Sequence, residues 1–247
     1  MKLKDSVIVI TGGAGCLGRE ISEHLITKGA TTVILDVMEQ MPSEGLRDHA
    51  HYQSANLSSH VEASKAFEQV AERFSRIDGL VNCVGMIHSE AFAGFSSDGL
   101  RMHDPEMFQK VIDCNLMTTF NATSACVREM ISRRLRGAIV NLSSVSSAGN
   151  PGQTAYSSAK AAIDSLTVSL ARELGPHGIR VNAVLPGLID TRSTRDAMSQ
   201  ESLDYLARLT PLRKLGQAES VAHMVSACLE NDFLSGALIP VSGGFKF

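Results

Sequence analysis

The sequence has few cysteines, and they lack the spacing that metal sites and disulfide frameworks use. The five stand at Cys16, Cys83, Cys114, Cys126 and Cys228, an odd number with no Cys-x-x-Cys pair. Each lies in an apolar stretch, where a free cysteine behaves as a small hydrophobic residue. We therefore expect no disulfide framework, no metal site and a reducing, cytoplasmic environment.

Long hydrophobic runs and an excess of one charge are also absent. No apolar run approaches the ~20 residues that a bilayer-spanning helix needs. The first predicted strand follows Met1 too closely to leave room for a signal peptide. Acidic and basic residues are interspersed, and the net charge is −3. We therefore expect a soluble protein that has neither nucleic acid nor a membrane as a partner.

Short apolar runs alternate with helical patterns from end to end, with no internal repeat, linker or low-complexity tract. Such alternation predicts right-handed βαβ units in one doubly wound parallel sheet, a three-layer α/β sandwich of about seven strands. A length of 247 residues suits one domain over 1–247. We expect strands near 7–10, 31–35, 52–55, 80–81, 138–142, 179–185 and 237–241. We expect helices near 17–28, 61–74, 104–131, 154–174 and 219–229.

Two segments, 86–103 and 188–212, show neither period and are predicted to be irregular. Both follow predicted strands. Ligands of a doubly wound sheet bind at the carboxyl ends of its strands. We therefore expect both segments to cover a bound substrate.

A glycine-rich turn lies between the first strand and the first helix. Gly13-x-Gly15-x-x-Gly18 follows the strand directly. Glycines in this position let backbone N–H groups approach a pyrophosphate, and the helix dipole favours the anion. We expect a Rossmann-type dinucleotide site here.

Asp36 ends the second strand, 18 residues after Gly18. A carboxylate about 20 residues after the last glycine accepts hydrogen bonds from the adenosine ribose. It would also repel the 2′-phosphate of NADP, and the next residues, Val37 and Met38, carry no compensating cation. The sequence therefore favours NAD over NADP.

Tyr156 and Lys160 stand one helical turn apart, so they share a helix face. Interconversion of an alcohol and a ketone by hydride transfer needs a group that gives and takes a proton. A free phenol titrates near ~10, and a nearby cation lowers that pKa. The pair therefore predicts a general acid/base.

Further motifs accompany this pair. They are 137–144, ending in Ser143-Ser144, 180–187, ending in Pro186-Gly187, Asn82-Cys83-Val84-Gly85, and Asn115 in mid-helix. Together they resemble the short-chain dehydrogenase/reductase family over about residues 3–244.

The resemblance implies roles for single positions. Tyr156 would be the general acid/base, Lys160 would lower its pKa and hold the nicotinamide ribose, Ser144 would hold the substrate oxygen, and Asn115 would anchor a water. The dinucleotide would contact residues along the strand ends: Gly12, Gly15, Cys16, Leu17, Gly18, Asp36, Val37, Asn56, Leu57, Asn82, Val84, Gly85, Tyr156, Lys160, Pro186, Gly187, Ile189 and Thr191.

The sequence departs from the family pattern at four places. Cys16 stands where a glycine is usual, and Cys83-Val84 is bulkier than the usual pair. Asn56 replaces an acid. The stretch between Ser144 and Tyr156 is about one residue shorter than is common, which leaves Ser143 as a second candidate for the catalytic hydroxyl.

Segments 108–117, 215–219 and 230–236 are similar to type II 3-hydroxyacyl-CoA dehydrogenases, which implies a small-molecule substrate such as an acyl-CoA. Segment 150–153 is similar to 3-oxoacyl-carrier-protein reductases, so an NADPH-dependent ketone reductase is an alternative. A third hypothesis is a non-catalytic dinucleotide sensor. The resemblance also implies a homo-oligomer, with a tetramer expected.

Overall fold

The computed structural model describes residues 1–40, 46, 49–97, 99–191, 194–195 and 199–246. Its centre is a parallel sheet of seven strands in the order β11-β8-β7-β4-β1-β2-β3, which confirms the predicted fold class. The strands are β1 (Val7–Thr11), β2 (Thr31–Asp36), β3 (Ala50–Ser54), β4 (Gly79–Asn82), β7 (Gly137–Leu142), β8 (Ile179–Pro186) and β11 (Leu238–Val241).

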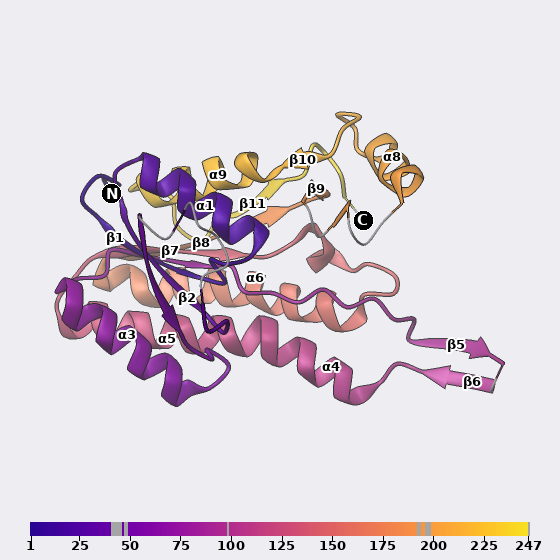
Figure 1. The fold of residues 1–247 in the computed structure, drawn as a ribbon, viewed down its shortest axis with the longest axis horizontal. Helices are drawn as coiled ribbons and strands as arrows, with labels where there is room; N and C mark the ends of the chain where they lie inside the picture. The colour runs from indigo at the N-terminus through magenta and orange to yellow at the C-terminus, as the bar shows by residue number, and fades with distance from the viewer. Residues whose placement is uncertain (41–45, 47–48, 98, 192–193, 196–198, 247) are drawn as a thin grey trace.

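Helices cover both faces of the sheet (Figure 1). On one face α1 (Cys16–Thr27) packs beside α9 (Ala218–Glu230). On the other lie α3 (His60–Phe74), α5 (Thr118–Ser132) and α6 (Thr154–Leu174). Two buried apolar clusters, one on each side of the sheet, form the core. This sandwich holds the strand ends in fixed positions.

The strands are short apolar runs because both of their faces are covered. All five residues of β1 are buried, as are the last five of β7. The strand order reverses between β1 and β4. The chain leaves β1 through α1 on one face of the sheet and leaves β4 toward α5 on the other face. A ligand therefore has access to the carboxyl ends of these strands.

The predicted helix over 104–131 is wrong in one respect. It consists of α4 (Pro105–Ile112), a π-helical turn (Asp113–Met117) and α5. The chain stays helical throughout, but the turn widens around Asn115. Periodicity could not show this, because one wide turn changes the apolar pattern little.

The two segments predicted to be irregular contain regular structure. Segment 86–103 holds an antiparallel hairpin of β5 (Ala93–Ser96) and β6 (Gly99–Met102), which projects from the body in Figure 1. It buries no face: Phe95 is 89% exposed, so its sequence shows no strand alternation.

Segment 188–212 holds β9 (Ile189–Asp190), paired with β10 (Gly216–Gln217), and α8 (Gln200–Leu209). The Ser199 hydroxyl caps α8 by accepting the Ser202 amide, at 3.3 Å. Leu203 is the buried residue of this helix. Residues 192–193 and 196–198 of the segment lie outside the described part. No helix in the described part of the chain is long and apolar enough to cross a bilayer.

Candidate active site

The glycine-rich turn leads from β1 into α1. Gly15 is the N-cap of α1, and within this described turn no side chain caps the helix and no acid stands in its first turn. The first backbone N–H groups of a helix without such a cap can bind an anion, which the helix dipole also favours. This end of α1 therefore fits a pyrophosphate.

Glycine is required at two points of the turn because the backbone closes on itself there. Gly12 has a φ of +66°, and a Cβ on it would lie 2.9 Å from the Val84 amide. A Cβ on Gly18 would overlap the carbonyl oxygen of Gly12. Gly15 has more room, since the nearest atom to its Cβ would be 3.4 Å away. Cys16 is exposed at the start of α1, so the bulkier residue does not distort the cradle.

Asp36 lies at the end of β2, beside this turn. Its carboxylate accepts the Ala14 amide at 3.2 Å and the Met38 amide at 3.3 Å. Val37, the residue after it, is 69% exposed. The structure therefore brings Asp36 to the glycine-rich turn, where the sequence placed the adenosine ribose.

Three residues that we expected around the adenosine have side chains that contact the protein itself. The Asn82 side chain is buried and donates to Thr123 Oγ1 and Asn141 Oδ1, both at 2.9 Å. Leu57 packs into the core, whereas Asn56 accepts the Ser58 amide at 3.2 Å. Asn82 and Leu57 can therefore offer a nucleotide only backbone atoms.

Tyr156 and Ser144 meet at the carboxyl end of β7. Tyr156 stands in the first turn of α6, and the Ser144 hydroxyl lies near its phenol, close enough to act on its pKa. Ser144 is held in place because its Oγ accepts the Ser146 amide at 3.1 Å. Ser143 points elsewhere and donates to the Lys160 carbonyl at 3.2 Å. The structure thus brings Ser144, and not Ser143, to the phenol.

Lys160 is buried one turn after Tyr156. Its ammonium donates to the Leu142 carbonyl at 2.8 Å and lies 5.5 Å from the centroid of the Tyr156 ring. Burial lowers the pKa of Lys160 to about 8, since the charged form is poorly solvated there.

Burial raises the pKa of Tyr156, and the nearby Ser144 hydroxyl acts in the opposite direction. The phenol is therefore protonated at neutral pH and able to donate. The lowering of this pKa by Lys160 stays a prediction.

Asn115 lies at the centre of the π-helical turn and is fully buried. Its Nδ2 donates to the carbonyls of Val111 (2.9 Å) and Met86 (3.0 Å). A Cβ on Gly85 would lie 3.0 Å from Asn115 Oδ1 and 3.4 Å from Lys160 Nζ. Asn115 and Lys160 therefore converge on Gly85. A π-turn inside a helix is frequent at functional sites.

Cys83 belongs to the motif at the end of β4, but the sequence indicated no role for its thiol, which lies near Lys160. Burial raises the pKa of its thiol to about 12, and the Lys160 ammonium acts in the opposite direction. The sequence signal for a residue of the site was its position directly after Asn82, at the end of β4. The thiol stays protonated and helps to exclude water from the lysine.

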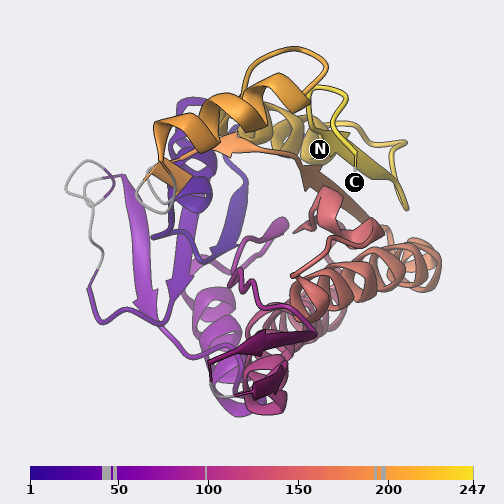
Figure 2. The same ribbon diagram turned by 90° about the vertical axis from the view of Figure 1, so that its right-hand side faces the viewer.

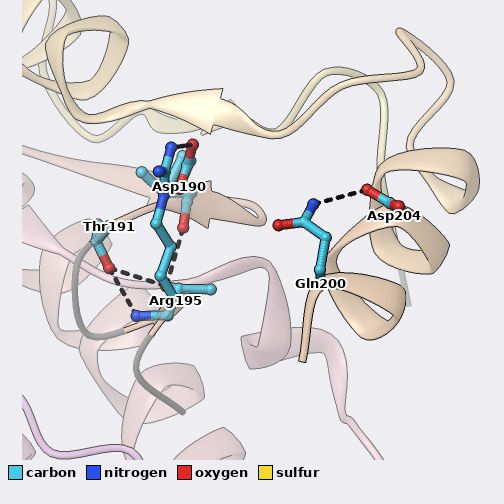
Figure 3. A network of polar contacts seen from close by, with 7 residues as sticks. Asp190, Thr191, Arg195, Gln200 and Asp204 are labelled. Atoms are coloured by element: carbon cyan, nitrogen blue, oxygen red, sulfur yellow. Dashed lines mark hydrogen bonds and ion pairs between the residues drawn. The ribbon is translucent and has the colours of Figure 1, made fainter. Parts of the chain in front are cut away.

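The strand end of β8 supplies the remaining expected residues. The turn at Gly187 is tight, because a Cβ there would lie 2.7 Å from Cα of Ser242. Ile189 is buried, and Thr191 accepts the Thr194 amide at 3.2 Å. Beside it Arg195 forms a bidentate ion pair with Asp190, both contacts at 2.6 Å, and Gln200 donates to Asp204 at 2.9 Å (Figure 3). These contacts hold the Arg195 side chain beside β9 and the Gln200 side chain at the start of α8.

Figure 2 views the molecule from the side at which the β5–β6 hairpin projects. Within this one edge the chain combines a glycine-rich turn that can fit a pyrophosphate, the Asp36 carboxylate beside it, and a buried phenol near a hydroxyl and an ammonium. The arrangement can bind a dinucleotide and exchange a proton with a substrate oxygen.

The chain is similar to known proteins. The chain matches the short chain dehydrogenase family over residues 6–202. It is 34% identical to 3-hydroxyacyl-CoA dehydrogenase type-2 of Mus musculus, covering 99% of this chain and 96% of that protein. It is also 34% identical to (3R)-3-hydroxyacyl-CoA dehydrogenase of Homo sapiens, covering 98% and 96%.

Among solved structures, NAD+-bound xylitol dehydrogenase superposes with a TM-score of 0.88 at 25% identity, covering 99% of this chain and 100% of that one. The chain therefore belongs to the short-chain dehydrogenase/reductase family and is an oxidoreductase that interconverts an alcohol and a ketone.

Proposed function

We propose that this enzyme is an NAD-dependent 3-hydroxyacyl-CoA dehydrogenase that uses Tyr156 as its general acid/base. The observation that carries the proposal is the nearness of the Ser144 hydroxyl to the Tyr156 phenol, close enough to act on its pKa. It places a proton-carrying phenol and a fixed hydroxyl together at the sheet edge that bears the glycine-rich turn.

The nicotinamide, when bound, supplies or accepts the hydride. Tyr156 takes the proton of the substrate hydroxyl in the oxidative direction and returns it in the reductive direction. Ser144 donates a hydrogen bond to the same substrate oxygen. Lys160, held by Leu142, contributes a positive charge that favours the phenolate when the proton leaves.

The choice of NAD rests on Asp36. Its carboxylate lies beside the glycine-rich turn and is held there by the Ala14 amide. A 2′-phosphate in the same place would meet this negative charge, whereas ribose hydroxyls can donate to it. The next two residues, Val37 and Met38, are uncharged and exposed.

The acyl-thioester substrate is supported by the relatives and by the surroundings of Tyr156. Met86, Met107 and Phe108 pack against the buried cluster that contains Tyr156. Apolar, partly flexible side chains suit an acyl chain. Both curated relatives described above are hydroxyacyl-CoA dehydrogenases.

An absorbance assay of the nicotinamide tests the proposal. Acetoacetyl-CoA, both enantiomers of 3-hydroxybutyryl-CoA and the matching free acids are compared, each with NAD(H) and NADP(H). We expect the thioesters with NAD(H) to give the highest kcat/KM. Faster turnover with NADPH would favour the carrier-linked ketone reductase, and turnover of the free acids alone would contradict the thioester assignment.

We also propose that the protein is a homotetramer. Met117, Phe120 and Ile131 are exposed apolar side chains on the π-turn and α5, a surface that a second copy could cover. Light scattering after size exclusion should give a mass four times 26.5 kDa. A monomer mass would contradict the assembly.

A further inference from the structure

Three side chains meet at the neck of the β5–β6 hairpin. Nε2 of His88 lies 3.3 Å from Oε2 of Glu90, and Nδ1 of His103 lies 3.7 Å from the same oxygen. One nitrogen or oxygen from each residue falls within 4.8 Å of the others. The side chains of His88 and Glu90 are 25% and 21% exposed, so solvent can reach the group.

The backbone fixes the two legs of the neck. His88 and Glu90 are two residues apart, and their side chains contact each other. The His103 amide donates to the Phe92 carbonyl at 2.9 Å, and the Glu90 amide donates to the Gly152 carbonyl at 2.7 Å. Both legs are thus attached to each other and to the residues just before α6. The group is held in place before any ligand arrives.

The chemistry of the three groups is that of a metal site. Two imidazoles and one carboxylate form a ligand set that zinc accepts, with bonds of about 2.0–2.2 Å. Ligand atoms of a tetrahedral ion at such distances are separated by about 3.4 Å, close to the 3.3 and 3.7 Å seen here. Among the ion pairs of the described residues, Glu90 takes part only in those with the two histidines. No lysine or arginine therefore competes with a cation in these pairs.

A metal would replace two hydrogen bonds of the group, one of them the 3.3 Å bond between His88 Nε2 and Glu90 Oε2. Nδ1 of His103 contacts the Asp104 carbonyl at 3.0 Å, and a metal on this nitrogen would replace that bond. The Asp104 amide contacts Oε2 of Glu90 at 3.3 Å and can keep orienting the carboxylate. Such supporting hydrogen bonds are usual around metal ligands.

We propose that His88, Glu90 and His103 bind one Zn²⁺ ion, with water completing its coordination. The ion would join the two legs of the hairpin beside Gly152, which accepts the Glu90 amide and lies four residues before Tyr156. The expectation of no metal site was based on the spacing of the cysteines. That spacing gives no information about a site built from two histidines and a carboxylate. The proposal does not depend on the identity of the substrate, because the metal can be bound without it.

Titration calorimetry of the full chain, freed of affinity tag and treated with chelator, tests the proposal with Zn²⁺ alone. We expect one ion per chain with a Kd on the order of 1 μM or tighter. His88→Ala and Glu90→Gln should each weaken binding by about 100-fold or more, since loss of even a supporting partner can cost that much. Co²⁺ should give visible absorption in the wild type that both variants lose.

Two matched variants complete the test. His177→Ala removes an exposed histidine elsewhere and should leave the Kd unchanged. His223→Ala disrupts the other histidine pair, in which His24 and His223 have ring centroids 4.7 Å apart. Wild-type Zn²⁺ affinity in His88→Ala and Glu90→Gln, a Kd weaker than about 100 μM in the wild type, or loss of binding only in His223→Ala would overturn the proposal. Circular dichroism establishes that each variant is folded.

Discussion

The ammonium of Lys160 donates a 2.8 Å hydrogen bond to the carbonyl of Leu142, two residues before Ser144. This contact joins α6 to the end of β7. It holds a buried positive charge between the Tyr156 ring and Gly85. Because Lys160 is buried, keeping it charged lowers the free energy of unfolding, and this effect can be measured as a pH dependence of stability.

Lys160→Met should remove a pH dependence of stability. Burial lowers the Lys160 pKa from 10.5 to about 8. Below pH 8 the lysine is charged in both states, and its desolvation destabilises the fold; above pH 10.5 it is neutral in both. Between these values the unfolded chain binds more protons, so folding stability rises with pH. The wild type should gain about 3 kcal/mol over the variant across this window.

Denaturant unfolding of both proteins from pH 7 to 11 measures this difference. Subtracting the curve of the variant from that of the wild type removes the contribution of the other titrating groups. A flat difference, or one that falls with pH, would contradict the assignment.

Ser144→Ala and Ser143→Ala form a matched pair. The Ser144 hydroxyl lies near the Tyr156 phenol, whereas Ser143 donates to the Lys160 carbonyl. We expect Ser144→Ala to lower kcat about 100-fold, as for loss of a donor to a reacting oxygen. Ser143→Ala should cost about 1 kcal/mol of stability and leave kcat close to the wild-type value. Reversed effects on kcat would assign the role to Ser143.

Asp36→Asn and Asp36→Ala test the choice of cofactor. Both remove the negative charge, but asparagine can still accept the Ala14 amide. The ratio of kcat/KM for NAD over NADP should fall at least about tenfold in both variants, since the repulsion of the 2′-phosphate is gone. Asp36→Asn should keep more of the NAD affinity. An unchanged ratio in steady-state kinetics would refute the role of Asp36.

Gly18→Ala should destabilise the fold, whereas Gly15→Ala should not. A Cβ on Gly18 overlaps the Gly12 carbonyl, and one on Gly15 has its nearest neighbour at 3.4 Å. We expect about 2 kcal/mol of lost stability for Gly18→Ala, the cost of forcing a methyl group into packed space. Chemical unfolding without cofactor measures it. Equal free energies for the two variants would mean that the turn is not closed as described.

Elements with a buried face could be predicted from the sequence, and exposed ones could not. The central strands and α6 were predicted because apolar runs and 3.6-residue periodicity record burial. The β5–β6 hairpin buries no face, so its sequence carries no such record. The π-turn at Asn115 is one wide turn inside a continuous helix. The spacing of apolar residues changes too little there to reveal it.

The candidate site divides in the same way. Tyr156, Lys160, Ser144 and Asn115 lie at motif positions, and the fold brings them to one edge. Side-chain direction was harder to predict: Asn82 and Leu57 turn into the core. The meeting of His88 with His103 needs the hairpin between them, so spacing along the chain gave no signal.

The central claim is that the phenol of Tyr156 carries the proton of the reaction, and Tyr156→Phe tests it most directly. Phenylalanine keeps the buried ring and removes only the hydroxyl. Turnover of 3-hydroxybutyryl-CoA is measured beside the Kd of NAD. Loss of a general acid/base predicts a fall in kcat of about 100-fold or more at nearly unchanged NAD affinity. Turnover at the wild-type rate would contradict it.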